Sequence, residues 1–381
     1  MTTNDSRLHW LDNLRWVTVL LVLVYHVIYF YNNKGVFGGI GGFDANPTGQ
    51  PQDVVMYILY PWFMLLLFLV AGISARYALE RQSHREFVAV RTRKLLVPAT
   101  IGLFVFQWMT GYFNIQISGV AQGVTDKMAS IPSVARWFAC ALSGTGPLWF
   151  VQDLWLFSLL LVLVRRIDRE DKCWNWCGNI SWWGILLLGV LVFLGSQALV
   201  MHPRPDSADG LFNLYKPLTY LVPFLLGYWV FSHPQVQDKV ARMRMPLLVA
   251  AIAAGVALVV TTWGDNNTSP QYMSGILNNL YAWLMMLALM GCFKAWCDVT
   301  GRFATYMTRS SYGIYVVHYL VIASLGYMMR VYTQLPVWSM YLLLLVAVMM
   351  LSPAIYELVR RIPVVCWCVL GMKGHNKKEK I

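Results

Sequence analysis

The sequence predicts an all-α, polytopic integral membrane protein, because of its composition, its long apolar runs and the placement of its basic residues. Of its 381 residues, 58% are hydrophobic and only 13% are charged. Soluble domains have about half apolar and about a quarter charged residues. About ten runs are long enough to cross a bilayer as helices. We expect these spans near residues 11–33, 54–80, 95–115, 147–165, 181–201, 213–232, 246–263, 274–296, 310–330 and 337–358.

Basic residues lie mainly in alternate loops between these runs. If both ends and every second loop are assigned to one side, that side receives most of the 30 Lys and Arg residues. The positive-inside rule then places the N and C termini in the cytoplasm, which an even number of spans requires. The same bias explains the net charge of +12, so this charge does not indicate nucleic acid binding. We expect a multi-pass protein of the cytoplasmic (inner) membrane, in contact with the lipid bilayer.

Residues 1–358 are expected to form one membrane domain, followed by a basic amphipathic cytoplasmic tail over residues 359–381. The lysines of this tail would face anionic headgroups of the inner leaflet. The seven cysteines lie mostly within or beside apolar runs, which argues against a disulfide framework. Cys173 and Cys177 have no second ligand pair nearby in the sequence, so no metal site is expected.

The first apolar run contains two ionisable residues that a lipid-facing helix does not need. It reads RWVTVLLVLVYHV, with Arg15 at one end and His26 near the other. Eleven residues turn a helix about 20° beyond three full turns, so these side chains share a face about 16 Å apart along the axis. Asp12 can pair with Arg15 near the cytoplasmic interface. An ionisable group deep in a membrane is a functional candidate by default, although the arginine alone could snorkel.

A second group precedes the third expected span, in the sequence RTRK. Arg91 and Arg93 carry planar guanidinium groups that suit an anionic, phosphate-bearing donor. The positive-inside bias alone also predicts basic residues at this place.

A third group comes from two segments that are far apart in the chain. Trp149 and Asp153 lie in the segment GTGPLWFVQDLWLF, and Tyr315 and His318 lie in the segment SSYGIYVVHYLV. These residues could bind or support a substrate, and Asp153 could orient a histidine. Ordinary hydrogen bonds between helices are the competing explanation.

Together these motifs resemble the acyltransferase family 3 membrane proteins. The resemblance rests on LDNLRWVTVLLVLVYH at 11–26, RTR at 91–93, PLWFVQDLWLF at 147–157 and SSYGIYVVHYLV at 310–321. The ending YELVRRIPVVCWCVLGMKG looks like that of the branch that decorates periplasmic glucans, for which succinyl transfer is implied.

The resemblance implies an O-acyltransferase that moves an acetyl or succinyl group from cytoplasmic acyl-CoA to a glycan hydroxyl beyond the membrane. His26 and Arg15 would be catalytic, and Arg15, Arg91 and Arg93 would bind the donor. A histidine suits this chemistry as a base of near-neutral pKa or as a carrier of the acyl group. Acyl-CoA enters as a substrate, and no tightly bound cofactor is expected.

Two other classes of protein fit the sequence. A transporter or flippase of a polar or anionic solute would use Arg15 and Asp153 as binding sites, without covalent chemistry. A non-catalytic membrane scaffold would tolerate apolar residues in place of Arg15 and His26.

Overall fold

The protein is helical throughout the part of the chain that its computed structural model describes, where no strand occurs. The all-α prediction is therefore confirmed. The described ranges are residues 8–31, 51–122, 131–168, 170–201, 211–212 and 214–372.

Eight helical segments in these ranges are long and apolar enough to cross a membrane, which confirms a polytopic membrane protein. One of them, Pro51–Arg81, combines η1 (Pro51–Asp53), α2 (Val54–Leu59) and α3 (Phe63–Arg81). The others contain α1 (His9–Phe30), α8 (Trp149–Ile167), α10 (Trp182–Met201), α13 (Arg244–Thr262), α15 (Ile276–Trp296), α16 (Arg302–Tyr332) and α17 (Val337–Arg361).

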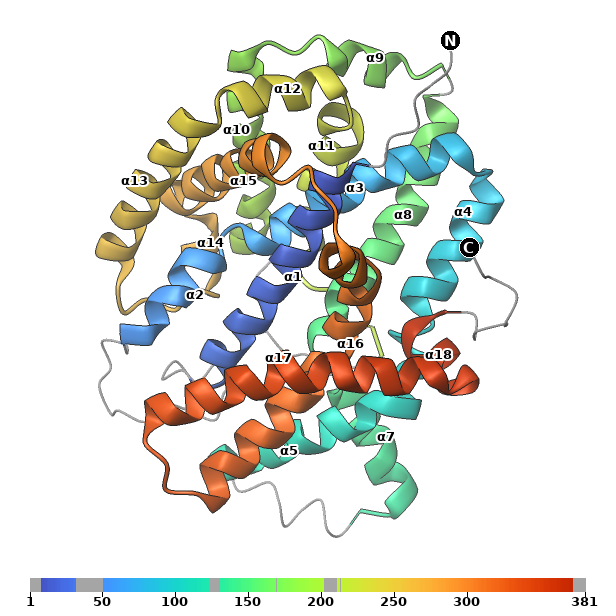
Figure 1. Ribbon diagram of the computed structural model, residues 1–381, viewed down its shortest axis with the longest axis vertical. Coiled ribbons are helices and arrows are strands. Elements are labelled where there is room, and N and C mark those ends of the chain that lie inside the picture. Colours follow the sequence, from blue (N-terminus) through green and yellow to red (C-terminus); the bar gives the residue numbers. More distant parts are fainter. Residues whose placement is uncertain are drawn as a thin grey trace.

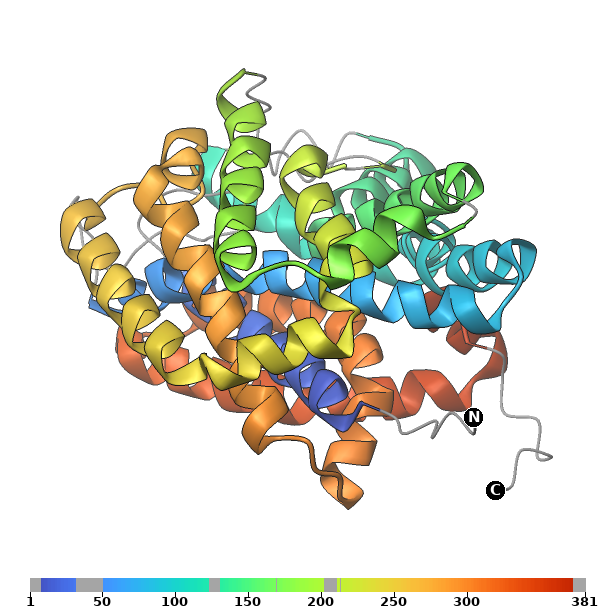
Figure 2. The ribbon, with the colours of Figure 1, turned by 90° about the horizontal axis from the view of Figure 1, so that it is seen from above.

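Helix α1 lies in the middle of the bundle, where it packs against α3, α15, α16 and α17 (Figure 1). Seen from above, α10 and α13 lie toward the outside of the assembly (Figure 2). These two helices bury only 22% and 28% of their apolar windows, which fits helices that face lipid. The polar residues of α1 are therefore placed among protein side chains, as its ionisable residues require.

One of the ten expected spans is shorter in the structure. Residues 213–232 were expected to span, but the apolar helix there covers Pro217–Phe231, as α11 (Pro217–Leu226) and the π-helix η5 (Gly227–Phe231). Glycines let α11 and η5 approach α3 closely. A Cβ at Gly72 of α3 would lie 2.0 Å from the carbonyl oxygen of Phe224, and one at Gly227 of η5 would lie 2.1 Å from that of Leu69. Small residues at such crossings are typical of membrane helices.

The span expected near residues 95–115 is interrupted. The chain forms the π-helices η2 (Thr92–Leu96) and η3 (Leu103–Gln107), with turns between them, before α5 (Trp108–Gln122). Pro98 lies in the gap, and proline removes a backbone donor and clashes with the preceding helical turn. A proline inside an apolar run therefore explains why the run does not form one straight helix.

Shorter helices complete the described fold. The C-terminal helix α18 packs against α17, α16 and η3, and its Cys366 and Cys368 are buried. The lysines expected in the tail lie outside the described residues, so the predicted division of the chain at residue 358 and the cytoplasmic side of both termini stay predictions. The remaining elements are α4 (His84–Arg91), α7 (Ser133–Ser143), η4 (Gly146–Leu148), α9 (Lys172–Gly178), α12 (Pro234–Arg242), α14 (Pro270–Ser274) and α18 (Pro363–Leu370).

Candidate active site

The structure brings together two histidines that are 292 residues apart in the sequence. α1 packs along α16, and Nδ1 of His26 lies 3.2 Å from Nε2 of His318. The ring centroids are 5.1 Å apart. His318 is fully buried at 0% exposure, whereas His26 is partly accessible. His26 is therefore the more accessible member of this pair.

Tyr315 connects the histidine pair to the start of α8. Nδ1 of His318 lies 2.5 Å from the backbone carbonyl of Tyr315, and the Tyr315 hydroxyl donates to the backbone carbonyl of Pro147. The ring of Phe150 packs edge-on against Tyr315 at 5.7 Å. Trp149 points into the aromatic group on α11, with its ring 5.1 Å from that of Tyr220. Tyr315 and His318, two of the four residues of the third predicted group, are thus linked to His26.

At the other end of α1, four basic residues form a group that we name the cation cluster: Arg15, Arg91, Arg93 and Lys94. The predicted pairing within α1 is confirmed, because Arg15 donates to the Asp12 carboxylate at 2.9 Å. Arg91 lies over the ring of Phe87 at 5.0 Å.

The four cations lie near enough to influence one another. Burial, and then the positive charge of Arg15, lowers the pKa of Arg91 to about 10. Burial, followed by the charges of Arg91, Arg93 and Arg15, lowers the pKa of Lys94. A like-charge neighbour disfavours the charged form, so an anion bound between these side chains would relieve their mutual repulsion.

The irregular backbone between η2 and η3 is held by side chains from two other helices. Pro98 has no N–H to offer the carbonyl of Lys94, and the hydroxyl of Tyr312 on α16 donates to that carbonyl at 2.5 Å. Gln152 on α8 donates to the carbonyl of Ala99 at 3.0 Å. Non-helical backbone at membrane depth persists only where its polar groups are satisfied. These two bonds therefore fix the segment that carries Arg93.

Arg93 keeps one donor unused. Its Nε is buried and has no hydrogen-bond partner within the described ranges. A buried donor without an acceptor is costly, which makes this guanidinium a suitable place for a ligand oxygen.

Among the described residues, Asp153 makes no hydrogen bond to either group. It is fully buried at 0% exposure, and neither carboxylate oxygen has a hydrogen-bond partner among the residues that the structure describes. Phe150 and Phe157, about one turn away on either side, both pack against Phe68 of α3. The structure therefore places Asp153 beside aromatic rings and shows no hydrogen bond between it and the histidine pair among the described residues, so its orienting role stays a prediction.

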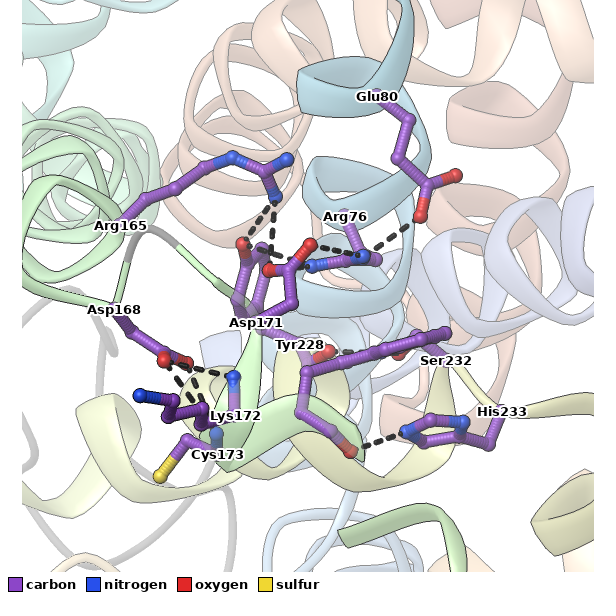
Figure 3. Close-up of polar contacts among 11 residues, drawn as sticks. Arg76, Glu80, Arg165, Asp168, Asp171, Lys172, Cys173, Tyr228, Ser232 and His233 are labelled. Carbon is purple, nitrogen blue, oxygen red and sulfur yellow. Dashed lines mark hydrogen bonds and ion pairs between the residues drawn. The ribbon is translucent and has the colours of Figure 1, made fainter. Parts of the chain in front are cut away.

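Sequence reasoning missed a polar network around Arg76 (Figure 3). Arg76 is 3% exposed and donates to Glu80 at 2.8 Å and to Asp171 at 2.7 and 3.1 Å. Its guanidinium also lies over the ring of Trp174 at 4.1 Å. These contacts tie α3 to the α8–α9 connection. Arg76 lies within the expected span 54–80, and a charged residue inside the apolar helix Phe63–Arg81 is a signal that it needs partners.

Among the described residues, no group of three or more His, Cys, Asp or Glu side chains could hold a metal ion.

The fold and the site define a class: a multi-pass membrane protein with a histidine pair inside the bundle and a cation cluster at one end of the same helix. The sequence pattern of the family described as "acyltransferase domain" matches residues 8–357, so the chain belongs to this acyltransferase family. No curated protein and no solved structure matches the chain. The match ends before α18, and no comparison supports the succinyl-transferring branch suggested by the ending.

Proposed function

We propose that the protein is an O-acyltransferase of the cytoplasmic membrane that moves an acetyl or succinyl group from cytoplasmic acyl-CoA to a hydroxyl of an extracytoplasmic glycan. The observation that carries the proposal is the arrangement along α1. One end of this helix supplies Arg15 to the cation cluster, and His26 lies three helical turns away, against His318. Family membership supports acyl transfer, and this arrangement supports the roles of the residues.

The donor would bind with its phosphates at the cation cluster. Arginine offers a rigid fork of donors that suits phosphate oxygens, and the buried Nε of Arg93 lacks an acceptor within the described part of the chain. The pantetheine arm would then extend into the bundle along α1. The distance of about 16 Å between Arg15 and His26 along the axis would separate the phosphates from the thioester.

At the thioester, His26 would act through a ring nitrogen that carries a lone pair. This nitrogen takes the proton of the glycan hydroxyl while the hydroxyl oxygen attacks the carbonyl carbon. The C–S bond breaks, and the departing thiolate receives that proton, which gives an ester and free CoA. In the alternative order, His26 first accepts the acyl group and then passes it to the glycan. Burst kinetics with acyl-CoA alone would indicate this second route.

Mass spectrometry of cell-envelope glycans tests the overall function. Cells with the protein should contain glycans with an ester-linked acetyl or succinyl group, and cells that lack the protein or carry His26→Ala should not. Unchanged glycans together with altered solute uptake would instead support a transporter.

Binding of CoA to the purified protein tests the donor site. We expect the double variant Arg91→Ala/Arg93→Ala to bind CoA at least about tenfold more weakly, because each lost charged hydrogen bond is worth about 1.5–3 kcal/mol. Arg242→Ala, an exposed residue at the end of α12, is the matched control and should bind normally. Equal affinity in all three proteins would exclude the cation cluster as the donor site.

A further inference from the structure

The hydrogen bonds around His318 determine which nitrogen of His26 carries a proton. A neutral imidazole has one N–H donor and one lone-pair nitrogen. The backbone carbonyl of Tyr315 can only accept, so Nδ1 of His318, 2.5 Å away, must be the donor. Nε2 of His318 is then an acceptor.

The same logic extends to the next ring. Nε2 of His318 can accept only if the nitrogen 3.2 Å from it, Nδ1 of His26, carries hydrogen. His26 is therefore the Nδ1–H tautomer, and its Nε2 holds the lone pair. A hydrogen bond to one ring nitrogen sets the role of the other in this way in many histidine sites.

The surroundings of His26 also limit how its ring can turn. Tyr25 and Tyr319 contact the ring edge-on, with centroids 5.5 and 5.4 Å away. Their packing holds the ring, and besides His318 the backbone carbonyl of Val22 is a hydrogen-bond partner of His26. Nε2 of His318, the nitrogen that faces His26, is itself held in place. The His318 side chain is fully buried, and its other nitrogen, Nδ1, is hydrogen-bonded to the backbone carbonyl of Tyr315.

We propose that His318 is a positioning residue that keeps His26 in the Nδ1–H tautomer and so directs the Nε2 lone pair of His26 toward the reacting groups. The inference deepens the proposed function and rests on it, since the lone pair matters only if His26 takes part in transfer. Either a base or an acyl carrier would need this nitrogen unprotonated.

Nitrogen-15 NMR of the full-length protein, labelled at histidine, tests the tautomer directly, because protonated and unprotonated ring nitrogens have well-separated chemical shifts. The His26 signals are those lost in His26→Gln. In the wild-type protein we expect Nδ1 to be protonated and Nε2 to be unprotonated. An Nε2–H tautomer in the wild type would overturn the proposal without need of any His318 variant.

Two variants test the role of His318. His318→Leu removes one of two acceptors beside the His26 ring, the other being the backbone carbonyl of Val22, so the population of the Nε2–H form of His26 should rise. Transfer to extracted envelope glycans, with acetyl-CoA or succinyl-CoA at saturating concentration, should fall about 10- to 100-fold, within the range that general-base catalysis contributes. His318→Gln can offer an amide oxygen near the former Nε2 position, and it should restore the Nδ1–H form and part of the rate.

The KM for acyl-CoA should change less than about twofold in both variants, because the cation cluster lies about 16 Å away along α1. A His318→Leu protein with an unchanged tautomer would overturn the proposal. The positioning role of His318 and the proposed function of His26 can fail separately. If His26→Gln abolishes transfer but wild-type His26 is the Nε2–H tautomer, only the positioning role of His318 is wrong. If His26→Gln transfers normally, the proposed function of His26 is wrong.

Discussion

The backbone of Gly371 lies against the backbone of Arg93. A Cβ at Gly371 would be 2.1 Å from the carbonyl oxygen of Arg93, and Gly371 has a left-handed φ of +61°. Glycine adopts this conformation without strain, and other residues rarely do. The residue that ends α18 therefore braces the segment that carries Arg93 and Lys94 of the cation cluster, although the two segments are almost 280 residues apart in the chain.

Gly371→Ala should weaken the donor site. The added methyl group cannot fit at 2.1 Å, so either α18 or the Arg93 segment must move. We expect CoA binding, measured by calorimetry, to weaken by about tenfold, which corresponds to about 1.4 kcal/mol. Gly301→Ala is the control, because no heavy atom lies within 4 Å of a Cβ there. Normal binding by Gly371→Ala would show that the brace does not position the cations.

Tyr312→Phe should also disturb this segment, by a different route. The substitution removes the donor to the Lys94 carbonyl, which Pro98 cannot replace. This hydrogen bond lies at an exposed position, and losing such a bond costs about 0.5–1.5 kcal/mol, so the melting temperature should fall slightly and the Kd for CoA should rise. Tyr332→Phe, at a tyrosine that is 75% exposed, should change neither quantity. A stable Tyr312→Phe protein with normal affinity would argue that the irregular backbone does not need this bond.

Asp153→Leu separates stability from function. Because the carboxylate is buried without a hydrogen bond in the described part of the structure, we expect the variant to be more stable by about 1–3 kcal/mol. A polar residue that is kept at such a cost is expected to serve the substrate, so glycan acylation should fall. Thermal unfolding and a transfer assay measure the two effects. Reduced stability would show that Asp153 has a structural partner instead.

The Arg76 network predicts a pH-dependent stability. The hydrogen bonds from Arg76 lower the pKa of Asp171 below its ordinary value. A lowered carboxyl pKa stabilises the fold above the unfolded pKa of about 3.9, and this contribution is lost as the pH falls through the folded value. Asp171→Asn should therefore lower stability by about 2 kcal/mol at pH 7, after allowance for the partial exposure of Asp171.

The difference between wild type and Asp171→Asn should shrink as the pH is lowered from 7 to about 3. Asp238→Asn is the matched control, because Asp238 pairs with Lys294 at 2.9 Å but is 57% exposed. An exposed ion pair contributes about 0–1 kcal/mol. A destabilisation by Asp171→Asn that is the same at both pH values would contradict an ionic origin.

Local periodicity was enough to predict much of the fold and part of the site. The apolar runs identified the spanning helices, and the three-residue spacing of Asp12 and Arg15 predicted their ion pair, which the structure confirms. These features depend on neighbours within one helix. The 3.6-residue repeat determines their relative positions whatever the rest of the chain does.

Contacts between distant segments could not be predicted in this way. Nothing in the spacing of His26 and His318 indicates that their rings meet, because this depends on how α1 packs along α16. The interruption near Pro98 was not predicted. The apolar run around it has the composition of a spanning helix, but Pro98 lacks the backbone N–H that a continuous helix needs. The closeness of Gly371 to Arg93 likewise depends on the path of the chain between them.

The most direct test of the central claim is the transfer of a labelled acyl group from acyl-CoA to extracted envelope glycans by the purified, membrane-reconstituted protein. The wild type and the control His84→Ala should transfer label at similar rates, since His84 begins α4 outside the histidine pair. His26→Ala, shown to be folded, should be slower by about 10²- to 10⁴-fold, the usual contribution of a general base. Equal rates for His26→Ala and the wild type would contradict the account.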